Sequence, residues 1–284
     1  MKRLAVIVIA VWLFFLQTGF CGDQGQYVEK MDNGSVNWSS NIVSAVGIGA
    51  PPEWSYGKPQ ARPMAITAAR IVAYRNLMEV VKGIQLQSST TVENFMLTDD
   101  TVRTQVNGMI QGARVTKTEY FEDGTVEVTV EMNLGGGFAQ LMLPQDIKQV
   151  EPIKTQPPAT GAAGTESGSL AQGFTGLVVD ALGLGAKPAM SPRILDEGGQ
   201  EVYGAAYVSR ENAIQQGMCG YATELKSAME DSRVAGNPLV VKGLRAEGEG
   251  RSDIVISNAD AAKLRSSSEN LSLLKQCRVM IAMN

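Results

Sequence analysis

Acidic side chains give this chain its main scope for acid–base or metal chemistry, because none of the 284 residues is a histidine. The absence of histidine excludes Ser-His-Asp and Cys-His nucleophile systems, histidine general bases and histidine-ligated zinc. Three groups of acidic residues are close enough in the sequence to act together. They are Asp99 with Asp100, Asp196 with Glu197, and Glu247 with Glu249 and Asp253.

The surroundings of all three groups favour structural roles over catalysis. The first pair suits the start of a helix, where side-chain oxygens and negative charge satisfy unpaired backbone N–H groups. The second pair falls in a predicted hairpin turn, and the third group flanks a bend at Gly248 and Gly250. None of the groups has the alternating ligands and closing glutamate of a calcium loop. We therefore expect no catalytic residue, no metal site and no bound cofactor.

Two short glycine motifs invite comparison with a dinucleotide-binding fingerprint. They are Gly-Ile-Gly at 47–49 and Gly-Leu-Gly at 183–185. Both lack the third glycine of the fingerprint, and Pro51 or Pro188 stands where the phosphate-binding helix would begin. We interpret both motifs as turn glycines rather than as nucleotide sites.

Three aromatic residues, Trp38, Trp54 and Tyr56, are the candidates for a ligand or partner surface. They lie close in the sequence to a turn rich in glycine and proline at 49–52. Exposed aromatic side chains beside such a turn can bind a sugar or a peptide. The same side chains can also cover an edge of the core, and the sequence leaves both interpretations open.

The N-terminus is typical of a secretory signal peptide. Two basic residues precede an apolar run of 13 residues, Leu4–Leu16, whereas a permanent transmembrane helix needs roughly 20. We predict that residues 1–21 are a signal peptide. A cysteine directly after an apolar run is the acylation site of bacterial lipoproteins, but the bulky Phe20 before Cys21 argues against lipidation.

Export would carry Cys219 and Cys277 into an oxidising compartment, where a disulfide can form and persist. Cys219 falls in a predicted helix, and Cys277 stands at the entry to a predicted strand. A disulfide between the two cysteines and two separate buried thiols both remain open.

A segment rich in Pro, Gly, Ser and Thr, residues 144–173, divides the chain. Because such a segment buries little apolar surface, we predict a linker between two units that fold separately. The predicted domains are residues 35–143 and 174–284. We expect an α+β fold of two small domains, each with a mostly antiparallel or mixed sheet and helices packed on one face.

Hydrophobic periodicity predicts the elements of the first domain. They are a strand at 42–49, a long helix at 61–82, a second helix that begins after Asp99, and a hairpin of strands at 113–121 and 125–134. The buried face of the long helix is expected to consist of Met64, Ala68, Ile71, Tyr74, Met78 and Val81. Strict alternation in the second hairpin strand predicts a sheet with one covered face and one solvent-exposed face.

The second domain is predicted from the same signals. Its strands are expected at 176–181, 193–195, 201–203, 239–244, 253–256 and 277–283. One helix is predicted at 209–231, although Gly217 and Gly220 weaken its middle. Another helix is predicted to begin at the cap Ser257 and to bury a face from Ala261 to Leu274.

Residues 42–134 contain an ordered series of motifs: Gly47-Ile48-Gly49-Ala50-Pro51-Pro52, then Ala73-Tyr74-Arg75-Asn76-Leu77, Gly83, Gly108, Gly112 and the Asp123-Gly124 turn. This series resembles the bacterial membrane-associated envelope lipoprotein family, and it is similar to the N-terminal domain of flagellar assembly protein T. The resemblance implies a small α+β domain without enzymatic activity, used in outer-membrane-associated assemblies of Gram-negative bacteria and, in some members, around the flagellar basal body. The chain departs from the family at Cys21, which lacks a good acylation context.

The leading functional hypothesis is a non-catalytic exported protein that contacts other envelope proteins in the periplasm or at the periplasmic face of the outer membrane. The first alternative is a periplasmic module that binds cell-wall glycan or a small ligand through the aromatic residues near Trp54. The second alternative is an enzyme that depends on carboxylates. A formal charge of −4 and a pI near 5.1 provide no basic surface for nucleic acid, so we expect no nucleic-acid partner.

Overall fold

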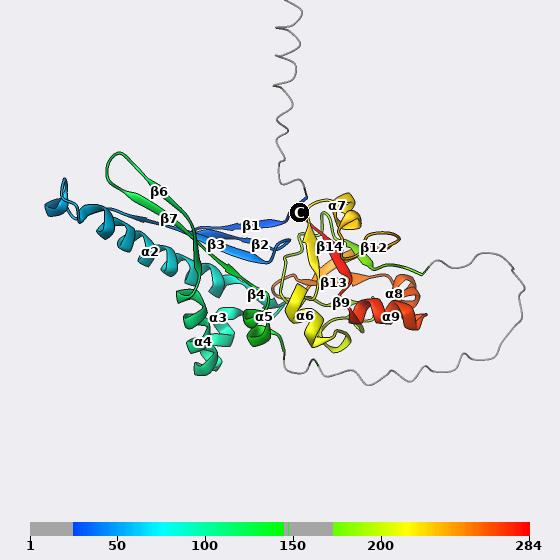
Figure 1. The fold of residues 1–284 in the computed structure, drawn as a ribbon. Coiled ribbons are helices and arrows are strands. Elements are labelled where there is room, and N and C mark those ends of the chain that lie inside the picture. Colours follow the sequence, from blue (N-terminus) through cyan, green and yellow to red (C-terminus); the bar gives the residue numbers. More distant parts are fainter. Residues whose placement is uncertain (1–24, 145–146, 148–172) are drawn as a thin grey trace, which may run out of the picture.

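The structure, a computed structural model, describes residues 25–144, 147 and 173–284. The predicted signal peptide, Cys21 and most of the predicted linker lie outside these residues. The described chain forms a first unit (25–144 with 147) and a second unit (173–284), which lie side by side (Figure 1). Of the described helices, none is both long and apolar enough to cross a lipid bilayer.

The first unit is built on an antiparallel five-stranded sheet in the order β1-β2-β3-β7-β6. Its strands are β1 (Val28–Met31), β2 (Gly34–Asn37), β3 (Ile42–Gly49), β6 (Arg114–Tyr120) and β7 (Val126–Asn133). The predicted strand at 42–49 and the predicted hairpin are confirmed, whereas β1 and β2 were not predicted. On one face of the sheet Val126, Val128 and Val130 are buried, and on the other Ile48 is exposed, as the alternation predicted.

Helix α2 (Ala61–Gly83) packs along the covered face of this sheet, on β3 and β7 (Figure 1). The predicted helix at 61–82 is therefore confirmed, but its predicted buried face is only partly right: Val81 is buried, and Tyr74 and Met78 are half-buried against the core. The buried residues are Ala65, Ala69, Ala73, Leu77, Val80 and Val81, while Ile71 is 56% exposed. The small residues are buried because α2 lies unusually close to β3. A Cβ atom on Gly47 would be 2.2 Å from the backbone nitrogen of Ala73.

The glycine motif at 47–49 thus belongs to a strand and not to a turn, which corrects our interpretation. Its glycines permit a close approach between helix and strand, since any side chain there would meet the helix backbone. The motif at 183–185 does lie in a turn. Gly183 and Gly185 have φ angles of 74° and 60°, which favour glycine.

Three further α-helices, a 3-10 helix and a small hairpin complete the first unit. They are α3 (Val92–Thr98), α4 (Asp100–Gln111), α5 (Gly137–Met142), the 3-10 helix η2 (Glu53–Ser55), and strands β4 (Gln85–Gln87) and β5 (Thr90–Thr91). Helix α4 begins as predicted, because Asp99 Oδ1 accepts hydrogen bonds from the N–H groups of Thr101 (2.7 Å) and Val102 (3.2 Å). Helices α3 and α5 and the small hairpin were not predicted.

The second unit contains a mixed seven-stranded sheet in the order β10-β9-β13-β12-β8-β14-β11. Its strands are β8 (Leu177–Asp180), β9 (Ile194–Leu195), β10 (Glu201–Tyr203), β11 (Gly220–Ala222), β12 (Leu239–Glu247), β13 (Asp253–Ile256) and β14 (Val279–Ala282). Its helices are α6 (Arg210–Gln216), α7 (Leu225–Glu230), α8 (Asn258–Arg265), α9 (Ser268–Lys275) and the 3-10 helix η3 (Ala205–Tyr207). Together with the first unit, this sheet confirms the α+β class.

Two helix predictions in the second unit are wrong. The segment at 209–231 is not one helix but α6, β11 and α7, because Gly217 adopts a φ of 80° that ends α6. Cys219 therefore lies in the short turn before β11. The helix capped by Ser257 is also two helices, since Ser267 begins α9 by accepting the N–H of Asn270 (3.1 Å). The cap itself is confirmed, because Ser257 Oγ accepts the N–H of Asp260 (3.1 Å).

The two units share one hydrophobic core, to which buried residues of both contribute. Backbone hydrogen bonds also cross the junction between them. They include Thr223 N–H to Gly25 O (3.1 Å), Met190 N–H to Gln85 O (3.0 Å), Ser191 N–H to Leu86 O (2.8 Å) and Gly136 N–H to Ile214 O (2.9 Å). The close contact between the units was not predicted, because the composition of residues 144–173 gives no information on the surfaces that flank them.

Candidate functional site

In Figure 1 the segment between β3 and α2 and the turn between β6 and β7 lie at the end of the first unit that is away from the second unit. Together with the end of β6, these two segments carry four exposed aromatic side chains, which we call the distal tip: Trp54, Tyr56, Tyr120 and Phe121. Each side chain is about half exposed, and Trp54 is 60% exposed. Trp54 lies within η2 and Tyr56 directly follows it, while Tyr120 ends β6 and Phe121 comes next. The turn at Gly124 brings the two segments together, and Tyr56 and Tyr120 line the same surface hollow.

Two cations, Lys58 before α2 and Arg62 in its first turn, lie over two of the four rings of the distal tip. Lys58 Nζ lies 5.5 Å from the centre of the Trp54 ring, and the Arg62 guanidinium lies 3.7 Å from the centre of the Tyr120 ring. Such contacts contribute about 0.5–1 kcal/mol each at exposed sites. The distal tip therefore presents aromatic groups whose orientations are restrained before any partner binds.

Trp38 does not belong to this surface, which corrects its grouping with Trp54 and Tyr56. It is only 2% exposed and lies at the junction of the two units. Its ring packs edge-on against Tyr221, with 5.7 Å between ring centres, and its indole N–H donates to Glu29 Oε2 (2.8 Å). Trp38 is therefore a core residue. Of the two interpretations of the sequence, the structure supports the one in which Trp38 covers an edge of the core, and not the one in which it binds a ligand.

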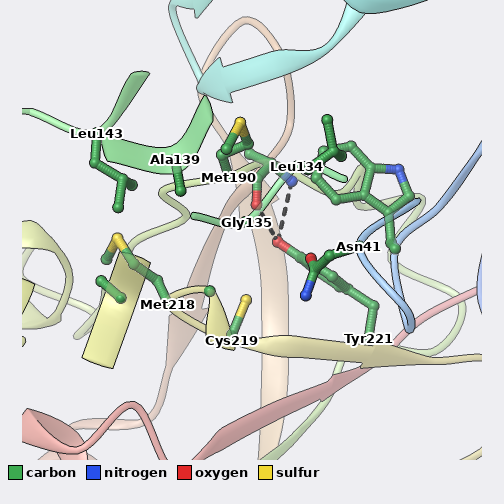
Figure 2. A pocket seen from close by; sticks show the side chains of 13 residues that line it. Asn41, Leu134, Gly135, Ala139, Leu143, Met190, Met218, Cys219 and Tyr221 are labelled. Carbon is green, nitrogen blue, oxygen red and sulfur yellow. Dashed lines mark hydrogen bonds between the residues drawn. The ribbon is translucent and has the colours of Figure 1, made fainter. Parts of the chain in front are cut away.

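A small cavity lies beside Trp38 in the junction, and Figure 2 shows how closely its lining side chains pack. Tyr221 Oη accepts the backbone N–H of Ala189 (3.0 Å) and donates to the carbonyl oxygen of the same residue (2.7 Å). Met190, Met218 and Leu143 fill much of the remaining space. The cavity measures about 20 Å³, which is room for about one water molecule. It is a packing defect of the junction rather than a ligand site.

Among the candidate carboxylates, Asp253 is the most buried, and it joins the two units. It accepts a hydrogen bond from Ser88 Oγ (2.6 Å) of the first unit, and it forms an ion pair with Arg193 (2.5 Å). Glu247 lies opposite Asp253 across the β12–β13 pair and forms its own ion pair with Arg245 (2.6 Å). These contacts support a structural role for both carboxylates.

The other acidic groups also have structural partners. Asp99 caps α4, and Asp100 lies in the first turn of that helix. Asp196 Oδ1 accepts N–H groups within the β9–β10 turn, and the N–H of Gln200 together with Arg265 lowers the pKa of Asp196. Across the described residues, no three His, Cys, Asp or Glu side chains are arranged to hold a metal ion.

Cys219 and Cys277 are both buried free thiols in the structure. Burial raises the pKa of Cys219 to about 12 and the pKa of Cys277 to about 11. At pH 8 both groups are therefore protonated, and the thiolate that reacts with alkylating agents is scarce.

We expect Cys219 and Cys277 to resist iodoacetamide at pH 8 in the folded protein and to react fully in denaturant. Peptide mass mapping after timed alkylation measures both states. Rapid labelling of either cysteine in the folded protein would contradict the buried positions. A peptide pair joined by a disulfide would contradict the free thiols.

Comparison with known families gives a match in the second unit. Residues 176–284 match the family model described as Treponema pallidum Tp0624, second domain. The match covers less than half of the chain, and it shows that the second unit is similar to a domain of a bacterial protein. No curated protein matches the chain.

Proposed function

We propose that this chain is a non-catalytic exported protein that binds other envelope proteins through the distal tip. The observation that carries the proposal is the cluster of Trp54, Tyr56, Tyr120 and Phe121, exposed together at the end remote from the second unit. Clustered exposed aromatic groups mark interaction surfaces more often than scattered ones do. Trp, Tyr and Arg are also the residues that most often dominate binding energy at protein interfaces.

The location in our proposal is the periplasm or the periplasmic face of the outer membrane of a Gram-negative bacterium. Its support comes from the apolar run at the N-terminus and from the resemblance of residues 42–134 to envelope lipoproteins and flagellar assembly protein T. The family match concerns a different part of the chain, and its bacterial source is consistent with this location. An assembly around the flagellum is one setting within this proposal.

The alternative is a module that binds cell-wall glycan through the same tip. It is favoured by the exposure of Trp54, because a flat aromatic face can stack against a sugar ring. Lys58 lies over that ring and would have to move before a sugar could stack on the same face. We therefore prefer a protein partner, whose side chains can reach the ring edges without displacing the cation. A carboxylate-dependent enzyme ranks last, because Asp253 and Glu247 are engaged in ion pairs with arginines.

The test is mild chemical crosslinking in cells that express either the parent chain or the double variant Trp54→Ser with Tyr56→Ser. We expect the crosslinked species to lose at least about 90% of their intensity in the double variant, since hot-spot residues each contribute about 2 kcal/mol or more. The matched control is Ile71→Ser, which replaces an equally exposed side chain midway along α2. It should leave the crosslinked species unchanged.

Three results would count against the proposal. Equal crosslinking by the parent and the double variant would exclude the distal tip as the contact surface. If the Ile71→Ser control lost the crosslinked species equally, the loss would come from replacing any exposed apolar side chain with serine and not from the distal tip. Retention of the parent chain, but not of the double variant, on purified peptidoglycan would favour the glycan alternative.

A further inference from the structure

Strand β6 is an edge of the five-stranded sheet, and one of its sides is unpaired. It follows β7 at the end of the strand order, and in Figure 1 no other strand lies beyond it. Within the described residues, the backbone hydrogen bonds of β6 all go to β7. An unprotected edge of this kind can pair with a strand from another chain.

The turn after β6 shows which backbone groups face outward. The N–H of Phe121 donates to Thr125 O (3.0 Å), and Phe121 O accepts the N–H of Gly124 (3.1 Å), so the backbone groups of Phe121 face β7. Because these directions alternate along a strand, the N–H and C=O groups of Thr118 and Tyr120 face away from β7. These two residues would therefore bond to an added strand.

The side chains of the same segment have a self-complementary charge pattern. Lys117 Nζ and Glu119 Oε2 form an exposed ion pair at 2.9 Å, and Thr118 lies between them in the sequence. If two copies of β6 pair antiparallel about a twofold axis at Thr118, Lys117 of each copy lies opposite Glu119 of the other. An axis at Lys117 or at Glu119 would instead place like charges opposite each other, which is destabilising.

We propose that two copies of this chain associate through their β6 strands, antiparallel and in register about Thr118. We assign a second copy of the chain as the partner of β6, because in this register Lys117 of each copy lies opposite Glu119 of the other. A lysine or a bulge is a common means of protecting an edge strand. Here the bulge lies between Val115 and Lys117, opposite Tyr120 of the other copy, so it limits the pairing to the segment around Thr118, and the charge of Lys117 is balanced by Glu119. The paired segment is short, so the dimer is expected to be weak and to depend on protein concentration.

The first test measures dimerisation by sedimentation velocity over a range of concentrations. Lys117→Glu or Glu119→Lys alone places like charges opposite each other twice per dimer, and we expect the dissociation constant to rise about tenfold or more. The double variant, Lys117→Glu with Glu119→Lys, restores the pairing and should return to within about threefold of the parent. Far-UV circular dichroism checks that each variant is folded.

The second test uses the short distance across the twofold axis. Opposed residues in a hydrogen-bonded antiparallel pair have Cα atoms about 5.5 Å apart, within the range for a disulfide. We expect Thr118→Cys to give a disulfide-linked dimer on mild oxidation, and Thr67→Cys, exposed on α2, to give none. The proposal is overturned if the parent remains monomeric at all concentrations, if single and double charge variants behave alike, or if both cysteine variants crosslink equally.

Discussion

Replacing Gly47 by alanine is expected to lower the free energy of unfolding by about 3 kcal/mol, near the upper end of what overpacking costs. The added Cβ atom would lie 2.2 Å from the backbone nitrogen of Ala73 and 2.3 Å from the carbonyl oxygen of Ala69. Both atoms belong to the backbone of α2, so no side-chain rotation can relieve the clash. The helix would have to move away from β3, which would open gaps along the buried alanines. Urea denaturation followed by circular dichroism measures the loss.

The matched control for this prediction is Gly108→Ala. Gly108 lies inside α4, and a Cβ atom there would meet nothing within 4 Å. Because alanine favours a helix over glycine, we expect this variant to gain up to about 1 kcal/mol. If both variants lost the same free energy, the close contact between α2 and β3 would be wrong.

Replacing Trp38 by alanine is expected to cost about 3–5 kcal/mol, as for other buried tryptophans. The ring is buried at the junction, packs against Tyr221 and donates its N–H to Glu29. Its removal would leave a cavity next to the one already present, and it would weaken the contact between the two units. The change in the midpoint of urea unfolding measures the effect.

Trp54→Ala is the control for Trp38→Ala, because the same substitution is made at an exposed position. We expect it to change the free energy of unfolding by about 0.5 kcal/mol or less, since surface substitutions rarely exceed this. If the proposed function is right, Trp54→Ala should nevertheless weaken binding of the partner protein. A large loss of stability in Trp54→Ala, or a negligible one in Trp38→Ala, would reverse the assignment of the two tryptophans to surface and core.

The elements that were predicted correctly are those specified by local signals. The β6–β7 hairpin follows from alternation around an Asp-Gly turn, and α4 follows from its Asp99 cap. Helix α2 is a long segment that ends at Gly83, so its existence and limits were clear from the sequence. These features depend on residues that are close together in the chain, so they can be predicted from a single sequence.

The errors concern contacts between residues far apart in the chain. Because Gly47 and Gly49 have no side chains, α2 lies close to β3, and this short distance leaves no room for a larger helical residue on the buried face. Hydrophobicity alone predicted that Ile71 is buried. The close packing of β3 against α2 instead selects small residues for the buried face. The break at Gly217 was signalled by glycine, but pairing of β11 with β14 is what makes a strand of the following residues.

The candidate site was partly predicted. Trp54 and Tyr56 are exposed at the distal tip, as one interpretation of the sequence required. Tyr120 and Phe121 were missed as site residues because they were considered only as parts of a strand. The available signal was the Asp123-Gly124 turn, which places the end of β6 at one extremity of the sheet. Trp38 was misplaced because its partner, Tyr221, lies in the other unit.

The most direct test of the proposed function is site-specific photocrosslinking in intact cells. A photoreactive phenylalanine analogue is introduced at Trp54 in one strain and at Ile71, which is equally exposed on α2, in another. We predict a discrete crosslinked protein from position 54, and none from position 71. If position 54 gives no crosslink, or if both positions give the same products, the distal tip is not a specific surface for a protein partner.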